Sequence, residues 1–147
     1  MRVIICSLMF LILLQNATMA LTCRPTAPDE LGLFYRPDAA ERTSVGKGYV
    51  LAGSVRSSAD CSPISHAKVE FWMAGPYGEY GEEFLETLFS SRTGAFRLEN
   101  HPPPPYFGRP PHIHIRVSVP GFRVLVTQNY PEPDSTAAVF DLVFVPK

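Results

Sequence analysis

The chain has 147 residues, of which 46% are hydrophobic and 18% charged, and its formal net charge is −1. This length is enough for one domain with its own hydrophobic core and too short for two. Because the sequence contains no run of basic residues, a nucleic-acid partner is not expected.

The first twenty residues have the pattern of a secretory signal peptide. Arg2 supplies a positive start, and residues 3–14 form an uncharged apolar run. That run is shorter than the about 20 residues that a membrane span needs, and small residues just before Leu21 favour cleavage there. An uncleaved anchor is the alternative. The pattern predicts a signal peptide over residues 1–20 and a secreted domain over residues 21–147, with no membrane attachment after cleavage.

Export would leave two cysteines in an oxidising environment. Cys6 lies in the predicted signal peptide, so Cys23 and Cys61 remain as an even pair. A disulfide between them would tie the N-terminal part of the domain to the rest and contribute about 4 kcal/mol by loop-entropy arguments. Two free buried cysteines are the alternative.

Fifteen prolines argue against long helices, and the apolar residues follow the period of short strands. Residues 21–45 are expected to form an extended arm over a sheet. Residues 75–91 are expected to be an acidic loop with one helical turn within 82–88. Strands are predicted at residues 49–55, 67–72, 96–98, 112–119, 122–130 and 139–145. Together they predict an all-β fold, an antiparallel β-sandwich.

The segment from Tyr106 to His114 carries the clearest chemical pattern. In a strand, residues two apart point to the same face, so His112 and His114 present both imidazoles to one point. Ile113 between them is expected to face the core. This spacing suits a metal, since imidazole is the commonest metal ligand. The alternative is a solvated polar strand face that continues to Arg116.

No cysteine or carboxylate near these histidines completes a zinc site or a two-histidine-one-carboxylate site. Tyrosines occupy the neighbourhood instead, with Tyr106 before the histidines and Tyr77 and Tyr80 after the strand at 67–72. A phenolate is a hard anionic donor that suits ferric iron. A bound cation can deprotonate a phenol whose free pKa is about 10. The candidate metal site therefore has both imidazole and phenol donors, and loops contribute much of it.

These segments resemble the intradiol ring-cleavage dioxygenases, whose best-known members act on protocatechuate and catechol. The similarity spans about residues 32–130, and its specific part is the Arg-Pro-x-His-x-His run in register with the preceding Trp-to-Tyr block. The matching segments are Val69-Glu70-Phe71-Trp72 with Gly78-x-Tyr80, then Pro105-Tyr106, Gly108-Arg109-Pro110-Pro111-His112-Ile113-His114, and Thr127-Gln128-x-Tyr130.

The resemblance implies an Fe(3+) cofactor held by Tyr80, Tyr106, His112 and His114. Tyr77 is a rival for the first position, because the loop could shift by one turn, and the family spacing favours Tyr80. The implied reaction is intradiol cleavage of a catechol-type diol by dioxygen, which yields a muconate-type diacid.

The resemblance also implies roles beyond the ligands. Arg109 would stabilise negative charge on the substrate ring, and Tyr106 would combine iron binding with a catalytic role. Gln128 would support the site from beside the ligands. Gly32 and Tyr35 match a family segment that lies near the substrate pocket.

The chain departs from the family pattern in several places. The stretch between Tyr106 and His112 is shorter than usual, and Leu33 replaces a proline near the pocket. The helical dimerisation domain of the catechol enzymes has no counterpart, and no feature specifies an oligomeric state. His66 and His101 match no ligand and are expected on loops or the surface. The shortened loop supports an alternative function, a secreted non-catalytic binding protein for a metal or a catechol-type ligand. A sandwich with incidental tyrosines and histidines is a third hypothesis.

Overall fold

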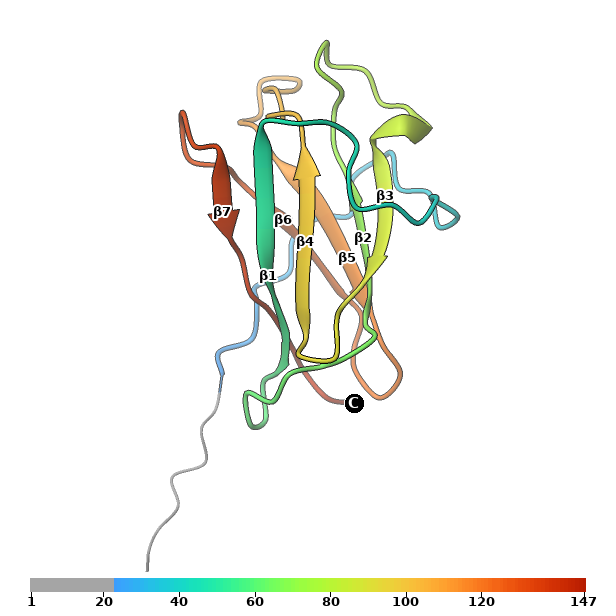
Figure 1. Cartoon of the computed structure of the whole chain (residues 1–147), viewed down its shortest axis with the longest axis vertical. Coiled ribbons are helices and arrows are strands. Elements are labelled where there is room, and N and C mark those ends of the chain that lie inside the picture. The colour runs from blue at the N-terminus through green and yellow to red at the C-terminus, as the bar shows by residue number, and fades with distance from the viewer. Residues whose placement is uncertain (1–22) are drawn as a thin grey trace, which may run out of the picture.

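A computed structural model of the chain describes residues 23–147, in which two β-sheets face each other across a hydrophobic core (Figure 1). The predicted signal peptide at residues 1–20 and its cleavage point before Leu21 lie outside the described residues. One sheet has the order β3-β2-β5-β6, formed by Leu85–Phe89, Lys68–Trp72, Ile113–Ser118 and Leu125–Asn129. The other has the order β4-β1-β7 with β8 also paired to β1, formed by Ala95–Asn100, Tyr49–Ser57, Ala137–Val139 and Leu142–Phe144.

The predicted all-β sandwich is confirmed, and the period-two alternation explains how it forms. Side chains alternate between the two faces of a strand, so every second residue of β5 enters the space between the sheets. Ile113 has no exposed surface, as predicted, and neither do Ile115 and Val117 two and four residues further along. Leu51 of β1 and Val69 of β2 are equally buried and belong to the same core cluster.

Two parts of the strand prediction were wrong. The helical turn predicted within 82–88 is present as a 3-10 turn at Glu82–Phe84, but it leads directly into strand β3, where a loop was predicted. The one acidic residue of β3, Glu86, interrupts its apolar pattern and is nevertheless buried. The predicted strand at 139–145 is interrupted: it contains β8 and only the last residue of β7. Both strands are parallel to β1, so the sandwich is not wholly antiparallel. The break comes at Asp141, whose carboxylate accepts a hydrogen bond from the Ser54 backbone N–H at 2.8 Å.

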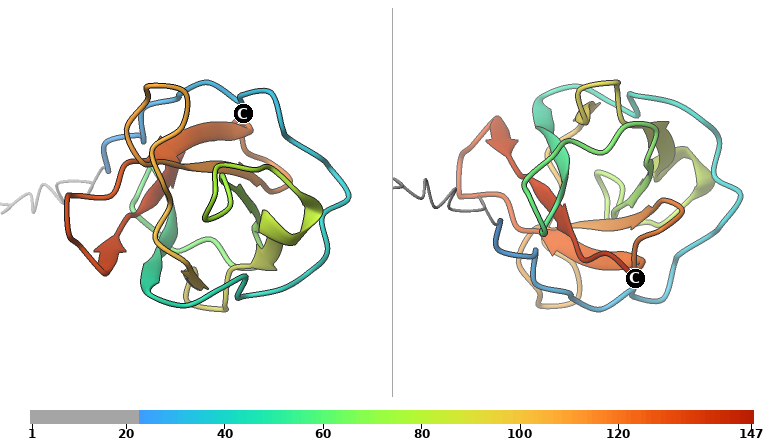
Figure 2. Two further views of the ribbon diagram at one scale, coloured as in Figure 1. Left: turned by 90° about the horizontal axis from the view of Figure 1, so that it is seen from above. Right: turned by 90° about the horizontal axis from the view of Figure 1, so that it is seen from below.

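The N-terminal arm, residues 23–45, runs in extended form around the outside of the β3-β2-β5-β6 sheet (Figure 2). Asp29 N–H donates to the Val126 carbonyl at 2.9 Å, and Arg42 N–H donates to the Thr87 carbonyl at 2.9 Å. A disulfide joins Cys23 to Cys61 and anchors the start of the arm. The arm therefore covers the outward-facing side chains of β2 and β5. Within the described residues, no helix is long and apolar enough to span a membrane.

Candidate functional site

The two histidines lie on the outer face of the sheet, beneath the arm. His114 of β5 is paired with Trp72 of β2 on one side and with Gln128 of β6 on the other. His112 immediately precedes β5 and points to the same side. Both histidines are only 3% exposed. This burial rules out the solvated strand face as the explanation of the His-x-His pattern.

The hydrogen bonds of His112 assign its protons. Nδ1 lies 2.7 Å from the Pro110 carbonyl oxygen, which can only accept, so Nδ1 carries the hydrogen. The Nε2 atom then carries the lone pair when the ring is neutral. Arg109 Nη1 lies 3.5 Å from this Nε2 atom. Burial lowers the pKa of His112, which keeps the imidazole neutral at pH 7.

His114 stacks on a neighbouring aromatic ring. Its ring lies parallel to the Trp72 indole, with centroids 5.1 Å apart and an interplanar angle of 4°. Its Nδ1 atom is buried without a hydrogen-bond partner. Burial, assisted by the neighbouring His112 and Arg109, lowers the pKa of His114 to about 4. Both imidazoles are thus neutral at pH 7, the state in which imidazole binds a metal.

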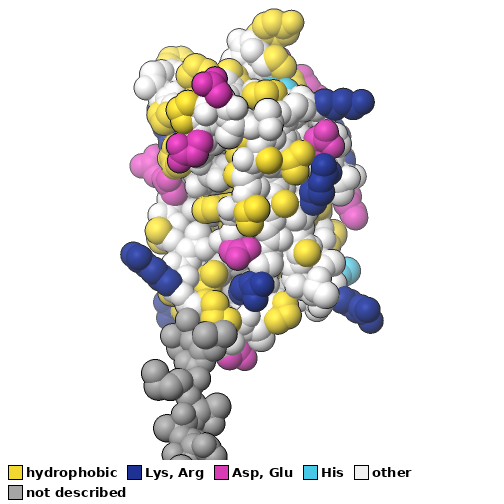
Figure 3. Space-filling view, turned by 60° about the vertical axis from the view of Figure 1, so that its left-hand side comes forward, with side chains coloured by type: hydrophobic (Ala, Val, Ile, Leu, Met, Phe, Trp, Pro, Cys, Tyr) yellow, Lys and Arg dark blue, Asp and Glu magenta, His cyan; other side chains and the backbone are white. Residues whose placement is uncertain are grey.

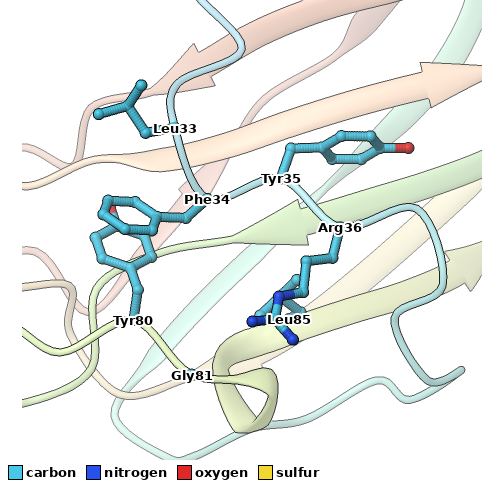
Figure 4. Close-up of a pocket in the computed structure, with 7 residues that line it drawn as sticks. All are labelled: Leu33, Phe34, Tyr35, Arg36, Tyr80, Gly81 and Leu85. Atoms are coloured by element: carbon cyan, nitrogen blue, oxygen red, sulfur yellow. The ribbon is translucent and has the colours of Figure 1, made fainter.

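Tyr80 and Tyr106 line the same cavity as the two histidines, a space of about 500 Å³. Their ring centroids are 5.0 Å apart in an edge-to-face arrangement. Phe34 of the arm stacks on Tyr80 with ring centroids 4.1 Å apart. Figure 4, which shows a smaller neighbouring pocket, contains this stacked pair. Tyr77, the rival candidate, is 96% exposed and lies outside the lining of this cavity. Burial raises the pKa of Tyr80, so its phenolate needs a nearby cation.

A tight hairpin turn connects Tyr106 to Arg109. Tyr106 N–H donates to the Arg109 carbonyl at 3.2 Å, and Arg109 N–H donates back to the Tyr106 carbonyl at 2.9 Å. The two central residues, Phe107 and Gly108, have φ of 49° and 75°, which is typical of a type I′ turn. This turn accounts for the short stretch before His112, and it brings the phenol and the guanidinium to the same cavity.

Hydrogen bonds hold the guanidinium of Arg109 in place, and the sequence predicted only one of the residues involved. Its Nη2 atom donates to Gln128 Oε1 at 2.7 Å and to the Tyr130 hydroxyl at 3.0 Å. Tyr130 in turn donates to Asp29 Oδ2 at 2.9 Å. Gln128 was predicted beside the site, whereas Asp29 and the role of Tyr130 were missed. Tyr130 stands in the matched Thr-Gln-x-Tyr segment, but no local pattern points to Asp29.

The two arm residues predicted near the pocket occupy different places. Gly32 lies against the imidazole, because a Cβ at this position would be 2.7 Å from His114 Cε1, and its φ is +76°. The Tyr35 ring points away from Phe34 and Tyr80 (Figure 4). It donates to Glu70 Oε1 at 3.2 Å and packs on Trp72 with ring centroids 5.2 Å apart. Tyr35 therefore supports the Trp72–His114 stack from behind and does not line the cavity.

The remaining histidines take no part in the site. His66 is exposed and stacks on Phe89 with centroids 5.1 Å apart. His101 is half-buried, and its Nε2 atom lies 3.0 Å from the Ala74 carbonyl oxygen. Neither residue lines the cavity, in line with their assignment to loops or the surface.

The donor atoms of the cavity fit ferric iron. Among residues 23–147, no group of three or more histidine, cysteine, aspartate or glutamate side chains lies close enough together to hold a metal ion. The cavity offers instead two neutral imidazoles and two phenols. Hard phenolate oxygens combined with imidazole match a highly charged cation better than soft or divalent ions.

The chain matches no family model and no curated protein. Solved structures do match it. The dioxygenase domain of a dioxygenase–carbohydrate-binding protein fusion from Streptomyces sp. SirexAA-E is 29% identical, with a TM-score of 0.75 over 84% of this chain and 100% of that one. An intradiol ring-cleavage dioxygenase from Tetranychus urticae is 16% identical, with a TM-score of 0.75 over 84% and 96%.

A third match is 3-chlorocatechol 1,2-dioxygenase from Rhodococcus opacus 1CP, 16% identical, with a TM-score of 0.74 over 83% of this chain and 73% of that one. All three share the sandwich that carries the cavity described above. The resemblance inferred from the sequence motifs is therefore confirmed: the domain is similar to intradiol ring-cleavage dioxygenases and shares their fold.

Proposed function

We propose that this protein is a ferric-iron-dependent dioxygenase that cleaves a catechol-type diol between its two hydroxylated carbons and yields a muconate-type diacid. The observation that carries the proposal is the common cavity of Tyr80, Tyr106, His112 and His114, with Arg109 in its lining. The names of the similar structures, which include catechol-type 1,2-dioxygenases, support this type of reaction.

The four phenol and imidazole side chains would hold the iron. When bound, ferric iron would supply a Lewis acid and a template for the diol and dioxygen. The neutral state of both imidazoles supports this role, because neither ring must lose a proton before binding. The tyrosines would bind as phenolates, which the cation itself stabilises against the effect of burial.

The chain would contribute proton and charge handling. A phenolate oxygen of Tyr80 or Tyr106 can accept a proton from the diol, which is general-base work at the cavity itself. Arg109 would stabilise the negative charge that develops on the ring, and Gln128 holds its guanidinium in place before the reaction begins. Such a fixed charge requires no reorganisation during the reaction, which is why its effect on rate is large.

The place of action is proposed to be outside the cell. The signal-peptide pattern and the disulfide at Cys23 and Cys61 support this, because disulfides persist in oxidising compartments. The partners proposed are a catechol-type diol and dioxygen. The absence of a basic run in the sequence argues against nucleic acid as a further partner.

A turnover experiment tests the proposal. The purified protein is loaded with ferric iron, mixed with catechol in air-saturated buffer, and the products are separated by chromatography. We expect cis,cis-muconate from the wild-type protein and none from His112→Ala. A yellow semialdehyde would indicate extradiol cleavage and would overturn the proposal. Binding of catechol with a spectral shift but no consumption of the diol would instead favour the alternative, a secreted binding protein.

A further inference from the structure

We infer that the cavity takes an extended aromatic diol, in which a second ring or another neutral apolar group is attached to the catechol ring, and that Phe107 clamps this group. The inference rests on the proposed function and names the substrate class for the same site. It comes from the size of the cavity, the side chains at its rim, the backbone of Phe107 and the charges in the lining.

The cavity is larger than a single catechol ring requires. Its volume of about 500 Å³ lies within the range of roughly 300–1,000 Å³ of pockets that bury drug-sized ligands. The phenol and imidazole donors form one part of the lining. The apolar part consists of Leu33, Phe34 and Phe107. A diol bound at the donors would therefore leave apolar space for a substituent.

Two large apolar side chains of the lining are almost fully exposed to solvent. Leu33 is 92% exposed and Phe107 is 89% exposed, yet both line the cavity. Hydrophobic side chains also project from the upper end of the molecule in Figure 3. Apolar side chains gain free energy when they leave water, and an exposed apolar rim around a cavity is typical of a ligand-binding site.

The positive φ of Phe107 indicates that the phenylalanine side chain has a role besides forming the turn. A φ of 49° is strained for a bulky residue, and asparagine or glycine is the preferred residue at this position of a type I′ turn. An asparagine here would form the same hairpin without strain and without an exposed ring. Strain of this kind concentrates at ligand clamps and active sites. The Phe107 ring also packs edge-on against Tyr106, with centroids 4.9 Å apart.

The charges of the lining favour a neutral substituent. Arg109 is the single cation among the residues that line the cavity. Its Nη2 atom is already bonded to Gln128 and Tyr130, and Tyr130 is bonded to Asp29. A carboxylate on the substrate ring would find no cation besides Arg109 in the cavity lining, and it would lose hydration on entering an apolar space.

Direct binding tests the inference without turnover. Trp72 is the only tryptophan of the chain and stacks on His114, so its fluorescence reports on occupancy of the cavity. Catechol, 3,4-dihydroxybiphenyl and 3,4-dihydroxybenzoate are titrated anaerobically into the iron-loaded protein and, separately, into the metal-free protein. We expect the biphenyl diol to bind about three- to tenfold more tightly than catechol, the range typical of one added aromatic contact. The benzoate is expected to bind more weakly than catechol.

The variant that tests the clamp is Phe107→Asn, which keeps the turn because asparagine tolerates a positive φ. In this variant the affinity ratio of biphenyl diol to catechol should fall to about one. Tyr77→Asn is the matched control, because Tyr77 is an equally exposed aromatic residue that does not line the cavity, and it should leave the ratio unchanged. Equal affinities in the wild-type protein, or a ratio that Phe107→Asn does not change, would overturn the inference.

The two proposals can fail separately. Preferred binding of the biphenyl diol with no cleavage of any diol would leave the clamp standing and contradict the dioxygenase function. Cleavage of catechol to muconate with no preference for the biphenyl diol would support the dioxygenase function and contradict the clamp.

Discussion

The guanidinium of Arg109 donates a hydrogen bond from Nη2 to Oε1 of Gln128 at 2.7 Å and so connects the Tyr106–Arg109 turn to strand β6. The same nitrogen donates to the Tyr130 hydroxyl at 3.0 Å. Two acceptors, Gln128 within β6 and Tyr130 just after its end, therefore hold the positive charge at the edge of the cavity. The charge is aimed before any substrate binds, which is the arrangement that stabilises a transition state most effectively.

Arg109→Ala is expected to slow diol cleavage by about a hundredfold or more, while iron content and visible absorption remain. The reason is that the proposed role of Arg109 lies in the transition state and not in iron binding. Steady-state rates and the visible spectrum are measured together. Arg36→Ala is the control, because Arg36 is an exposed arginine paired with Glu82 outside this cavity. Loss of colour together with activity would assign Arg109 to the iron site itself.

Tyrosinate bound to ferric iron absorbs visible light, so the iron-loaded protein is expected to be red to burgundy. Tyr80→Phe and Tyr106→Phe should each lose or strongly shift this absorption, because each removes one candidate phenolate. Tyr77→Phe should keep it, since Tyr77 is exposed and outside the cavity lining. Iron content is measured alongside the spectra. A Tyr77→Phe protein that bleaches while Tyr80→Phe stays coloured would reverse the assignment.

Gly32→Ala is expected to weaken iron binding by roughly ten- to a hundredfold, the range found when groups that orient metal ligands are changed. Its new methyl group would meet His114 Cε1 at 2.7 Å and force the arm or the ring to move. Affinity is measured by competition with a chelator. Gly121→Ala is the control, because Gly121 has a similar positive φ of +87° with no atom within 4 Å of its Cβ position. Equal losses in both variants would mean that backbone strain, and not the contact with His114, is responsible.

The disulfide between Cys23 and Cys61 closes a loop across 38 residues, and its removal by Cys23→Ser is expected to lower the free energy of unfolding by about 4 kcal/mol. Denaturant unfolding of both proteins measures this difference. Mass spectrometry after alkylation without reductant should find neither thiol labelled in the wild-type protein. Labelling of both thiols in the folded protein would show that the bridge does not form.

Stability is expected to depend on the protonation of Glu86. Burial raises the pKa of this carboxyl from 4.5 to about 8 in the folded chain, opposed in part by Arg42. Below about pH 4.5 both states hold the proton and the stabilisation is complete. Between about pH 4.5 and 8 only the folded chain keeps the proton, so stability falls as the pH rises, by at most about 1.4 kcal/mol per pH unit.

Glu86→Gln tests this dependence, because glutamine has nearly the same shape and no titration. The melting temperature of the wild-type protein should fall between pH 5 and pH 8 more steeply than that of the variant. Parallel melting curves for the two proteins across this range would show that Glu86 is not the titrating group.

The sequence alone was sufficient for the features that depend on neighbours along the chain. Alternation of apolar residues predicts β5 and its buried isoleucines, because strand geometry repeats every two residues. The same geometry directs His112 and His114 to one side. The motifs around them identify the candidate phenols and the arginine, and the even cysteine count after export predicts the bridge.

The tertiary structure decided the features that depend on which distant segments meet. Asp29 and Tyr130, 101 residues apart, hydrogen-bond to each other only because the arm lies along β6. The choice between Tyr77 and Tyr80 depends on how one loop turns toward the cavity. Glu86 is buried although its side chain is ionisable, because β3 pairs with β2. Periodicity records the geometry of one strand, whereas burial and the membership of a cavity follow from contacts across the whole chain, which no local pattern encodes.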